Sequence, residues 1–370
     1  MNLSFERLFN KALGKIIEDY KEKGESLSEE ILTQAIHNSL DDDLFNNIAE
    51  NFYQILKDNM YEPLELERLI HTEFRSRIKQ RWIRPLALFN SLIIITEEIC
   101  TNDINKTNEI KILDENTSEH SLKYYTFMKL LAKQILLAKE IHYLLEGGFA
   151  DAALSRWRTA HETKIILFIF LKYYDNDKIM NELLTRFNDA SIVEEYKECR
   201  WHNNSNDNYF KDLKKNYKNL LKKYGDSFKF DYEWARPIFD SLSRRIYFKD
   251  LEIHVRNHEE TLSFYQKANY QIHSSPLGTF DSLGTIDIEG LESPPYIFGP
   301  SNLGLRIPGQ LEIFTLYETI VTYLNATPSI DNLIYIKTLG KFMNEAFEEF
   351  ERVEEEIIND ELSFSEENNV

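Results

Sequence analysis

The sequence has little glycine, proline or cysteine, and each shortage limits what it can encode. Its 370 residues include 12 Gly, 9 Pro and 2 Cys. So few helix-breaking residues disfavour a turn-rich β fold and favour helices. Cys100 and Cys199 lie far apart and form neither a metal-binding spacing nor a disulfide framework, which predicts a cytoplasmic protein without a metal or other cofactor.

Long apolar runs and an excess of positive charge are also missing. The longest apolar run, Ile165 to Leu171, has seven residues, whereas a membrane-spanning helix needs about 20. The N-terminal residues lack the apolar core of a signal peptide. A net charge of -19 opposes sequence-independent binding to duplex nucleic acid. We therefore expect no membrane partner, and RNA binding only through a local cationic rim. This rim would include Arg156, Arg158, Arg244, Arg245 and the lysines of 211–223.

Apolar residues recur at helical spacing through most of the chain, which predicts an all-α, multi-helix bundle. The pattern is strongest over residues 121–145 and 151–174, on either side of Gly147 and Gly148. A glycine pair is typical of a helix end, and two long helices joined by a short turn pack as an antiparallel hairpin. This hairpin is predicted to lie at the centre of the bundle.

The remaining segments are predicted from the same pattern. We expect helices within 1–60, two helices meeting near Pro85 in 64–99, helical structure over 177–224, and helices at 250–272, 310–326 and 330–358. The polar stretch 101–120 predicts a surface loop with a short extended piece at Ile110–Ile112. The predicted domains are an N-terminal helical region (1–82), a central helical domain (83–327), and a C-terminal helix with a tail (328–370).

Two segments stand out by composition. Residues 276–309 hold six Gly and five Pro, which predicts a long irregular loop segment. The last thirty residues carry 11 acidic and 2 basic side chains, which predicts a frayed acidic tail. Seven Lys between residues 211 and 229 form either a solvated face or a nucleic-acid patch.

The first candidate site lies on the helix that follows Gly148. Arg158 and Glu162 are four residues apart, so they share a helix face and can pair. The helix then becomes apolar, which carries this face towards the interior. Since a buried ion pair is weak evidence for stability, a structural pair and a polar pocket both remain open.

The second candidate site lies on the helix near residue 270. Tyr265, Asn269 and His273 fall at i, i+4 and i+8, so three polar side chains share one face. A structural and a catalytic role for His273 both remain open.

Together these segments resemble a bacterial family of all-helical domains of unknown function, whose members recur near mobile and anti-phage defence genes. The matching residues are Gly148-Phe149, Trp157-Arg158 with Glu162, Tyr232 with Trp234-Ala235, Tyr265 with His273, and the segment 298–308. The resemblance covers about 83–327 and implies a pocket that joins Arg158, Glu162 and His273. The chain has Asn269 where the family pattern has Ser, so a polar contact is retained but a serine nucleophile is not.

A second pattern, Arg156 with His161, resembles the R-x4-H motif of HEPN ribonucleases, a superfamily of helical enzymes. That resemblance implies metal-independent RNA cleavage, with the histidine moving a proton and the arginine holding the phosphorane charge. On a regular helix the two side chains point about 140° apart. The sequence has no P-loop, dinucleotide-binding, zincin or nucleophile-elbow motif.

Two functions are consistent with these patterns. The first is an effector of a bacterial anti-phage defence or toxin system, acting as a metal-independent ribonuclease. Its predicted catalytic residues are Arg158, Glu162, His273, Arg156 and His161, and its predicted substrate-binding residues are Tyr265, Asn269 and Trp157. The alternative is a non-catalytic helical module that binds a partner protein or a small ligand through the same pocket. The expected partners are RNA, a partner protein of a defence system, or a second copy in a homodimer.

Overall fold

The computed structural model of the chain describes residues 42–113, 118–201, 208–255, 260–273, 275–285 and 298–368, with isolated positions before residue 42. Within these ranges every regular element is helical, which confirms the all-α fold. The elements are α3 (Asp42–Asp58), α4 (Tyr61–Leu113), α5 (Ser118–Glu146), α6 (Ala150–Lys172), α7 (Asp177–Trp201), α8 (Asn208–Tyr224), η1 (Asp226–Lys229), η2 (Glu233–Ile238), α9 (Phe248–Val255), α10 (Glu260–Ile272), α11 (Pro276–Phe280), α12 (Arg306–Ala326) and α13 (Ile330–Asn368).

The chain divides into two compact units, Met1–Glu73 and Phe74–Val370. In the first unit, the described residues of α3 and of the beginning of α4 are largely exposed. The second unit holds the hydrophobic core and all of the site residues discussed below. The domain boundaries predicted at residues 82 and 327 differ from this division and stay predictions.

The predicted antiparallel hairpin is confirmed as α5 and α6, which pack along each other. The N–H of Phe149 donates to the carbonyl of Leu144 at 2.9 Å, and that of Gly148 donates to Leu145 at 3.0 Å. This pair of bonds is a Schellman motif, which needs a left-handed residue at the helix end. Gly148, whose φ is +77°, is this left-handed residue. The local sequence therefore ends α5 and reverses the chain.

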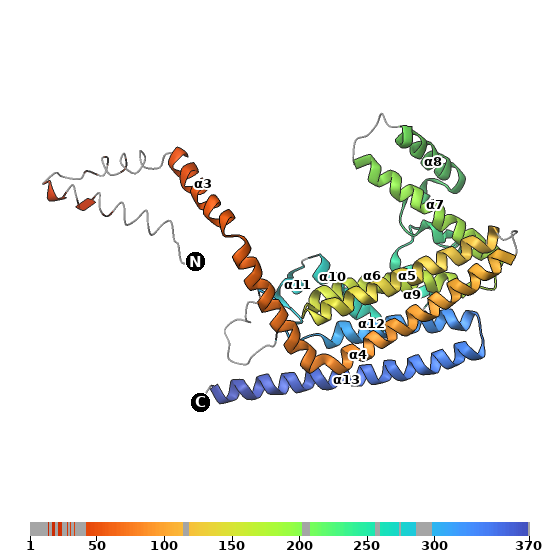
Figure 1. Ribbon diagram of the computed structural model, residues 1–370. Helices are drawn as coiled ribbons and strands as arrows, with labels where there is room; N and C mark the ends of the chain where they lie inside the picture. The colour runs from red at the N-terminus through yellow and green to blue at the C-terminus, as the bar shows by residue number, and fades with distance from the viewer. Residues whose placement is uncertain are drawn as a thin grey trace. The chain divides into compact units, whose positions relative to one another are not determined.

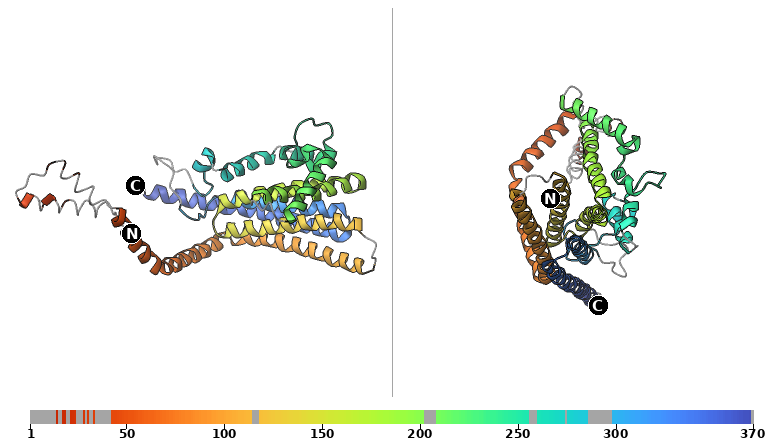
Figure 2. Two further views of the ribbon diagram at one scale, coloured as in Figure 1. Left: turned by 90° about the horizontal axis from the view of Figure 1, so that it is seen from above. Right: turned by 90° about the vertical axis from the view of Figure 1, so that its right-hand side faces the viewer.

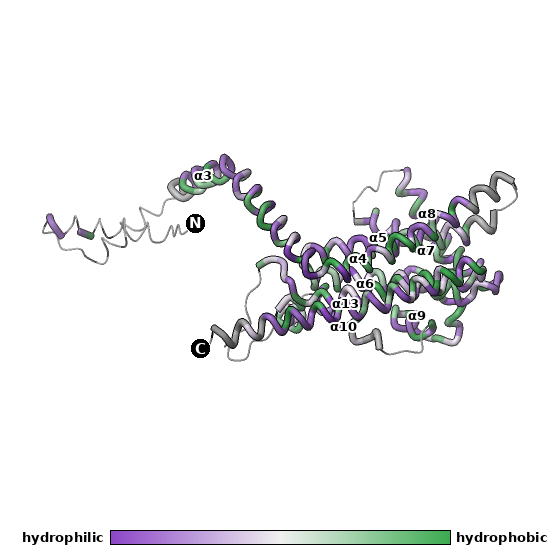
Figure 3. The backbone as a smooth tube through the Cα atoms, turned by 60° about the horizontal axis from the view of Figure 1, so that its bottom comes forward, coloured by the Kyte–Doolittle hydropathy of each residue, from purple (hydrophilic) through white to green (hydrophobic). Residues whose placement is uncertain are grey.

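The second unit is a bundle of long helices around this hairpin. The views in Figures 1 and 2 agree in placing α5, α6, α12 and α13 alongside one another. Helix α12 contacts both helices of the hairpin and also α13. Along the long helices, hydrophobic and hydrophilic residues alternate (Figure 3), as expected where one face of each helix packs on a core.

Two predictions about α4 are wrong. The helix continues through Pro85, where a helix boundary was expected, and it runs to Leu113. A proline inside a helix costs about 3 kcal/mol, but the neighbouring Trp82 and Phe89 are fully buried, and their packing offsets that cost. The expected loop and extended piece at 101–113 are helical because this stretch has neither Gly nor Pro, while Asp103 also accepts a hydrogen bond from Tyr323 at 3.0 Å.

The predicted frayed tail is also wrong, because α13 continues to Asn368. Val353 and Ile357 are buried on one face of the helix. On the other side, Arg352 pairs with Glu349 at 2.8 Å and with Glu356 at 2.6 Å. Pairs with i,i+3 and i,i+4 spacing stabilise a helix, so the acidic composition does not disrupt it.

Other expectations were correct in part. The segment 250–272 contains two helices, α9 and α10, and residues 256–259 between them lie outside the described residues. The helices predicted at 177–224, 310–326 and 330–358 are confirmed as α7 with α8, α12 and α13. In the Gly/Pro-rich segment, α11 and the first turn of α12 are helical, while residues 286–297 lie outside the described residues. Most of the helices expected before residue 42 lie outside them too.

Candidate functional site

Three side chains from α6 and α10 form a connected polar cluster. The Nε of Arg158 lies 3.1 Å from Oε1 of Glu162 and donates to the hydroxyl of Tyr265 at 3.2 Å. The Tyr265 hydroxyl in turn donates to Oε1 of Glu162 at 2.6 Å. The predicted pairing of Arg158 with Glu162 is thus present, and the structure adds Tyr265 as a bridge between them.

The cluster fixes one edge of the Arg158 guanidinium and leaves the other edge without a bond. Among the described residues, neither Nη1 nor Nη2 of Arg158 forms a hydrogen bond. The Arg158 side chain is 25% exposed, as is that of Glu162. Burial opposes the charge of Arg158, but the bond to Tyr265 and the charge of Glu162 raise its pKa overall. A charged guanidinium with two open nitrogens can hold a carboxylate or a phosphate through a bidentate contact.

Tyr232 adds a strained residue to the cluster. Its φ of 64° lies in the left-handed region, which an aromatic residue rarely adopts. Burial and the charge of Glu162 raise its pKa to about 12, while the charges of Arg158 and Arg245 oppose that rise. The Tyr232 side chain therefore lies near both guanidinium groups. Strained backbone of this kind is concentrated at functional sites.

Arg245 supplies a second incompletely bonded cation beside Tyr232. Its Nη2 donates to Asp231 at 2.9 Å, and its side chain is 36% exposed. Its Nε is buried and has no hydrogen-bond partner within the described ranges. Arg158 and Arg245 thus both act on the pKa of Tyr232, and each has a nitrogen without a hydrogen bond among the described residues.

Aromatic rings pack against the two tyrosines of the cluster. Phe248 stacks on Tyr265 with ring centroids 5.1 Å apart, and its ring lies 6.1 Å from that of Tyr232. The His161 ring lies 5.7 Å from that of Tyr265. Because these rings are packed into the core, they hold the two tyrosines in place.

His161 and Trp157 lie inside the core. The side chain of His161 has no exposed surface, and its Nε2 lies 2.6 Å from Oε1 of Glu252 on α9. Trp157 is also fully buried, and its Nε1 donates to the hydroxyl of Thr315 at 2.9 Å. Side chains without exposed surface touch no substrate in this structure. These positions therefore support the fold around the cluster.

The other predicted site residues lie apart from the cluster. Arg156 pairs with Glu140 on α5 and is 40% exposed, so it points away from buried His161, as expected from the helix geometry. His273 is exposed and directly follows the last residue of α10. Eight residues separate it from Tyr265, a rise of about 12 Å along a helix.

Asn269 lies between Tyr265 and His273 on α10. Its Oδ1 is buried and has no hydrogen-bond partner in the described part of the chain. Arg158 and Glu162 are close together, as predicted. His273 follows the last residue of α10. Its catalytic role stays a prediction.

Some of the predicted cationic residues are paired with carboxylates, and others are exposed to solvent. Arg244 makes a bidentate pair with Asp250, with both bonds at 2.7 Å, and it is therefore already occupied. Helix α8 buries Leu213 and Leu220 and exposes its lysines to solvent. Lys223 at the end of α8 pairs with Asp189 at 3.2 Å. These observations are consistent with a solvated lysine face.

Neither a metal centre nor a membrane span emerges from the described residues. They contain no group of three or more His, Cys, Asp or Glu side chains arranged to hold a metal ion. None of the described helices is both long and apolar enough to cross a membrane.

The site contains residues that the sequence did not assign to it. Glu252 belongs to no motif, and only its tertiary position brings it near the cluster through His161. Arg245 was predicted only as a member of the cationic rim. Tyr232 was part of the family resemblance but was not predicted as a site residue. Its place in the Y-x-W-A pattern was the only available signal.

Comparison with known proteins gives one match. The chain matches no curated protein and no solved structure. Residues 124–289 match the model of a family of unknown function (DUF5677). This range contains the four residues of the cluster, Arg158, Glu162, Tyr232 and Tyr265. Over this range, the chain is therefore similar to a family of unknown function, as the sequence patterns predicted.

Proposed function

We propose that the chain is a non-catalytic helical module that binds an anionic group of a small ligand at Arg158. The observation that carries the proposal is the state of this guanidinium. Glu162 and Tyr265 hold its Nε, while Nη1 and Nη2 have no hydrogen bond among the described residues. A fixed fork of two donors is well suited to a carboxylate or a phosphate.

The neighbouring residues support the same conclusion. The charges of Arg158 and Arg245 both oppose the rise in the pKa of Tyr232, so the potential at its hydroxyl has a positive contribution from each. A binding module needs such donors but needs no proton-transfer group in the cluster. Neither histidine of the predicted site forms a hydrogen bond with Arg158, Glu162 or Tyr265 among the described residues, and His161 is buried against Glu252.

The test is the stabilisation of the protein by small anions. We expect that inorganic phosphate, adenosine monophosphate or glutarate at millimolar concentration raises the midpoint of thermal unfolding. Arg158→Lys keeps the charge but removes the fork, and it should abolish the rise. Arg156→Lys is the matched control on the same helix and should retain the rise. Absence of a rise for all three anions, or an equal rise in Arg158→Lys, would contradict the proposal.

The predicted ribonuclease activity is the competing interpretation, and it is tested with the wild type and His273→Ala. If the chain only binds, total bacterial RNA stays intact during induction of the wild type and of His273→Ala. Fragmentation by the wild type that is lost in His273→Ala, with unchanged thermal unfolding, would favour the enzyme. The predicted role in a defence or toxin system stays a prediction in either case.

A further inference from the structure

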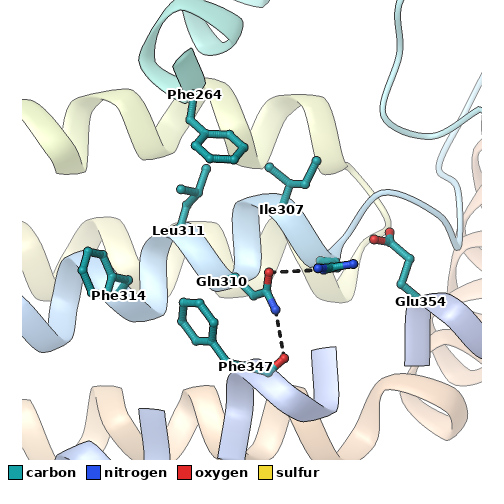
Figure 4. Close-up of a pocket in the computed structure, with 8 residues that line it drawn as sticks. Phe264, Ile307, Gln310, Leu311, Phe314, Phe347 and Glu354 are labelled. Atoms are coloured by element: carbon teal, nitrogen blue, oxygen red, sulfur yellow. Dashed lines mark hydrogen bonds between the residues drawn. The ribbon is translucent and has the colours of Figure 1, made fainter. Parts of the chain in front are cut away.

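A second concave site is lined by residues of α10, α12 and α13 and shares no lining residue with the polar cluster. It has a volume of about 550 Å³, a size typical of small-molecule sites. Its lining residues are Phe264, Arg306, Ile307, Gln310, Leu311, Phe314, Phe347 and Glu354. Figure 4 shows that Phe314 lies at one end of this pocket and Glu354 at the other. The pocket is therefore divided into an apolar end and a polar end.

The apolar end is built from aromatic and aliphatic side chains. Phe314 and Phe347 approach edge to face, with ring centroids 6.5 Å apart. Leu311 and Phe264 lie beside them in Figure 4. All four side chains are only partly buried, so the pocket leaves apolar surface uncovered. Covering that surface is favourable by about 25 cal/mol per Å².

The polar end has more carboxyl groups than cationic groups. Arg306 donates to Gln310 at 3.3 Å and pairs with Glu351, so its charge is already neutralised. Burial raises the pKa of Glu354, against the opposing effects of the backbone N–H groups of Gly304 and Arg306 and of the Arg306 charge. The Oε1 of Glu354 is buried and has no hydrogen-bond partner in the described parts of the chain. Two carboxyl groups, Glu351 and Glu354, thus accompany one guanidinium at this end of the pocket.

We propose that this pocket binds a small molecule that has an apolar body and a protonated amine as its head. The apolar body would cover Leu311, Phe314 and Phe347. The ammonium would donate to the unsatisfied Oε1 of Glu354, since a buried polar atom without a hydrogen bond is costly. A carboxylate head has no hydrogen to donate to this oxygen and would add a further carboxyl group at the same end. The inference does not depend on the function proposed for Arg158.

The experiment compares three probes that have the same chain and different heads: octylamine, octanol and octanoate. Isothermal titration at neutral pH should show that octylamine binds at least tenfold more tightly than octanoate, with octanol in between. Glu354→Gln should reduce octylamine affinity at least tenfold. Glu355→Gln, an exposed position on the same helix, is the matched control and should bind like the wild type.

A second variant addresses the apolar end. Leu311→Trp should fill the pocket and abolish binding of all three probes, while circular dichroism confirms that the helices remain. Equal affinity for the three heads, unchanged octylamine binding in folded Glu354→Gln, or no binding of any probe would overturn the proposal. Arg158→Lys should bind octylamine like the wild type, so that failure at one site is distinguished from failure at the other.

Discussion

The hydroxyl of Tyr265 donates to Glu162 at 2.6 Å, which joins two helices whose residues are 103 positions apart in the sequence. The same hydroxyl accepts the Nε hydrogen of Arg158, so one oxygen atom connects both charges of the pair. Burial and the bond to Glu162 raise the pKa of Tyr265, which keeps it protonated and able to donate. The tyrosine therefore determines which edge of Arg158 is held.

Tyr265→Phe should lower the free energy of unfolding by about 1–2 kcal/mol, because it removes a hydroxyl bonded to two charged groups. Tyr270→Phe on the same helix is the control. Its side chain is 37% exposed, so the change there should stay within about 0.5 kcal/mol. Urea unfolding of both variants makes the comparison. Equal losses would show that the bridge adds nothing to stability.

Glu312 should make stability fall as pH rises. Its side chain is fully buried on α12, and this burial raises its pKa, against the opposing effects of Lys164 and of a bond from Gln134. The folded state therefore keeps a proton that the unfolded chain releases above its ordinary pKa. This contribution is complete below that pKa and is lost as pH rises towards the folded-state value, by at most about 1.4 kcal/mol per pH unit.

Gln cannot bind or release a proton, so Glu312→Gln should make the free energy of unfolding depend less on pH. In urea unfolding between pH 5 and 8, stability of the variant should fall less steeply than that of the wild type. The exposed substitution Glu355→Gln should keep the wild-type slope. An unchanged slope in Glu312→Gln would assign the pH dependence to other groups.

Replacing either residue of the R-x4-H pattern should destabilise the protein, but by different amounts. His161→Ala leaves Glu252 buried without its partner, and a loss of about 3–5 kcal/mol is expected. Arg156→Ala breaks a pair whose side chains are 40% and 37% exposed, and about 0–1 kcal/mol is expected. Chemical denaturation measures both. A mild effect of His161→Ala would indicate that the site tolerates water or repacks.

The turn between α5 and α6 should not accept a side chain. A Cβ at Gly148 would lie 2.7 Å from the carbonyl oxygen of Ser301, in addition to the strain of φ +77°. Left-handed strain alone costs an L-residue about 1–2 kcal/mol. Gly148→Ala should cost more than this because of the added clash with Ser301, measured as the thermal unfolding midpoint.

A loss for Gly148→Ala no larger than about 1–2 kcal/mol would mean that the segment around Ser301 moves aside. In the wild type this segment is attached to the turn, because the Ser301 N–H donates to the carbonyl of Gly148 at 3.0 Å. The position of the turn is therefore fixed by both its own backbone and a segment 150 residues later in the chain.

The sequence by itself determined the features that depend on neighbouring residues. Helical spacing and the Gly147-Gly148 pair predicted the α5–α6 hairpin, because backbone hydrogen bonds within a helix and at its end are local. The pairing of Arg158 with Glu162 followed from their i,i+4 spacing for the same reason. The continuation of α4 through Pro85 could not be predicted, since packing of distant residues outweighs the local cost.

Only the tertiary structure decided what each polar residue contacts. His161 and Arg158 lie three residues apart on one helix, yet the first is buried against Glu252 and the second keeps open donors beside Tyr265. Those partners come from α9 and α10, and no pattern in the sequence specifies how these helices dock. The free energy of docking comes from burying apolar surface over the whole bundle, so the surroundings of each charge are set by contacts that are distant in the chain.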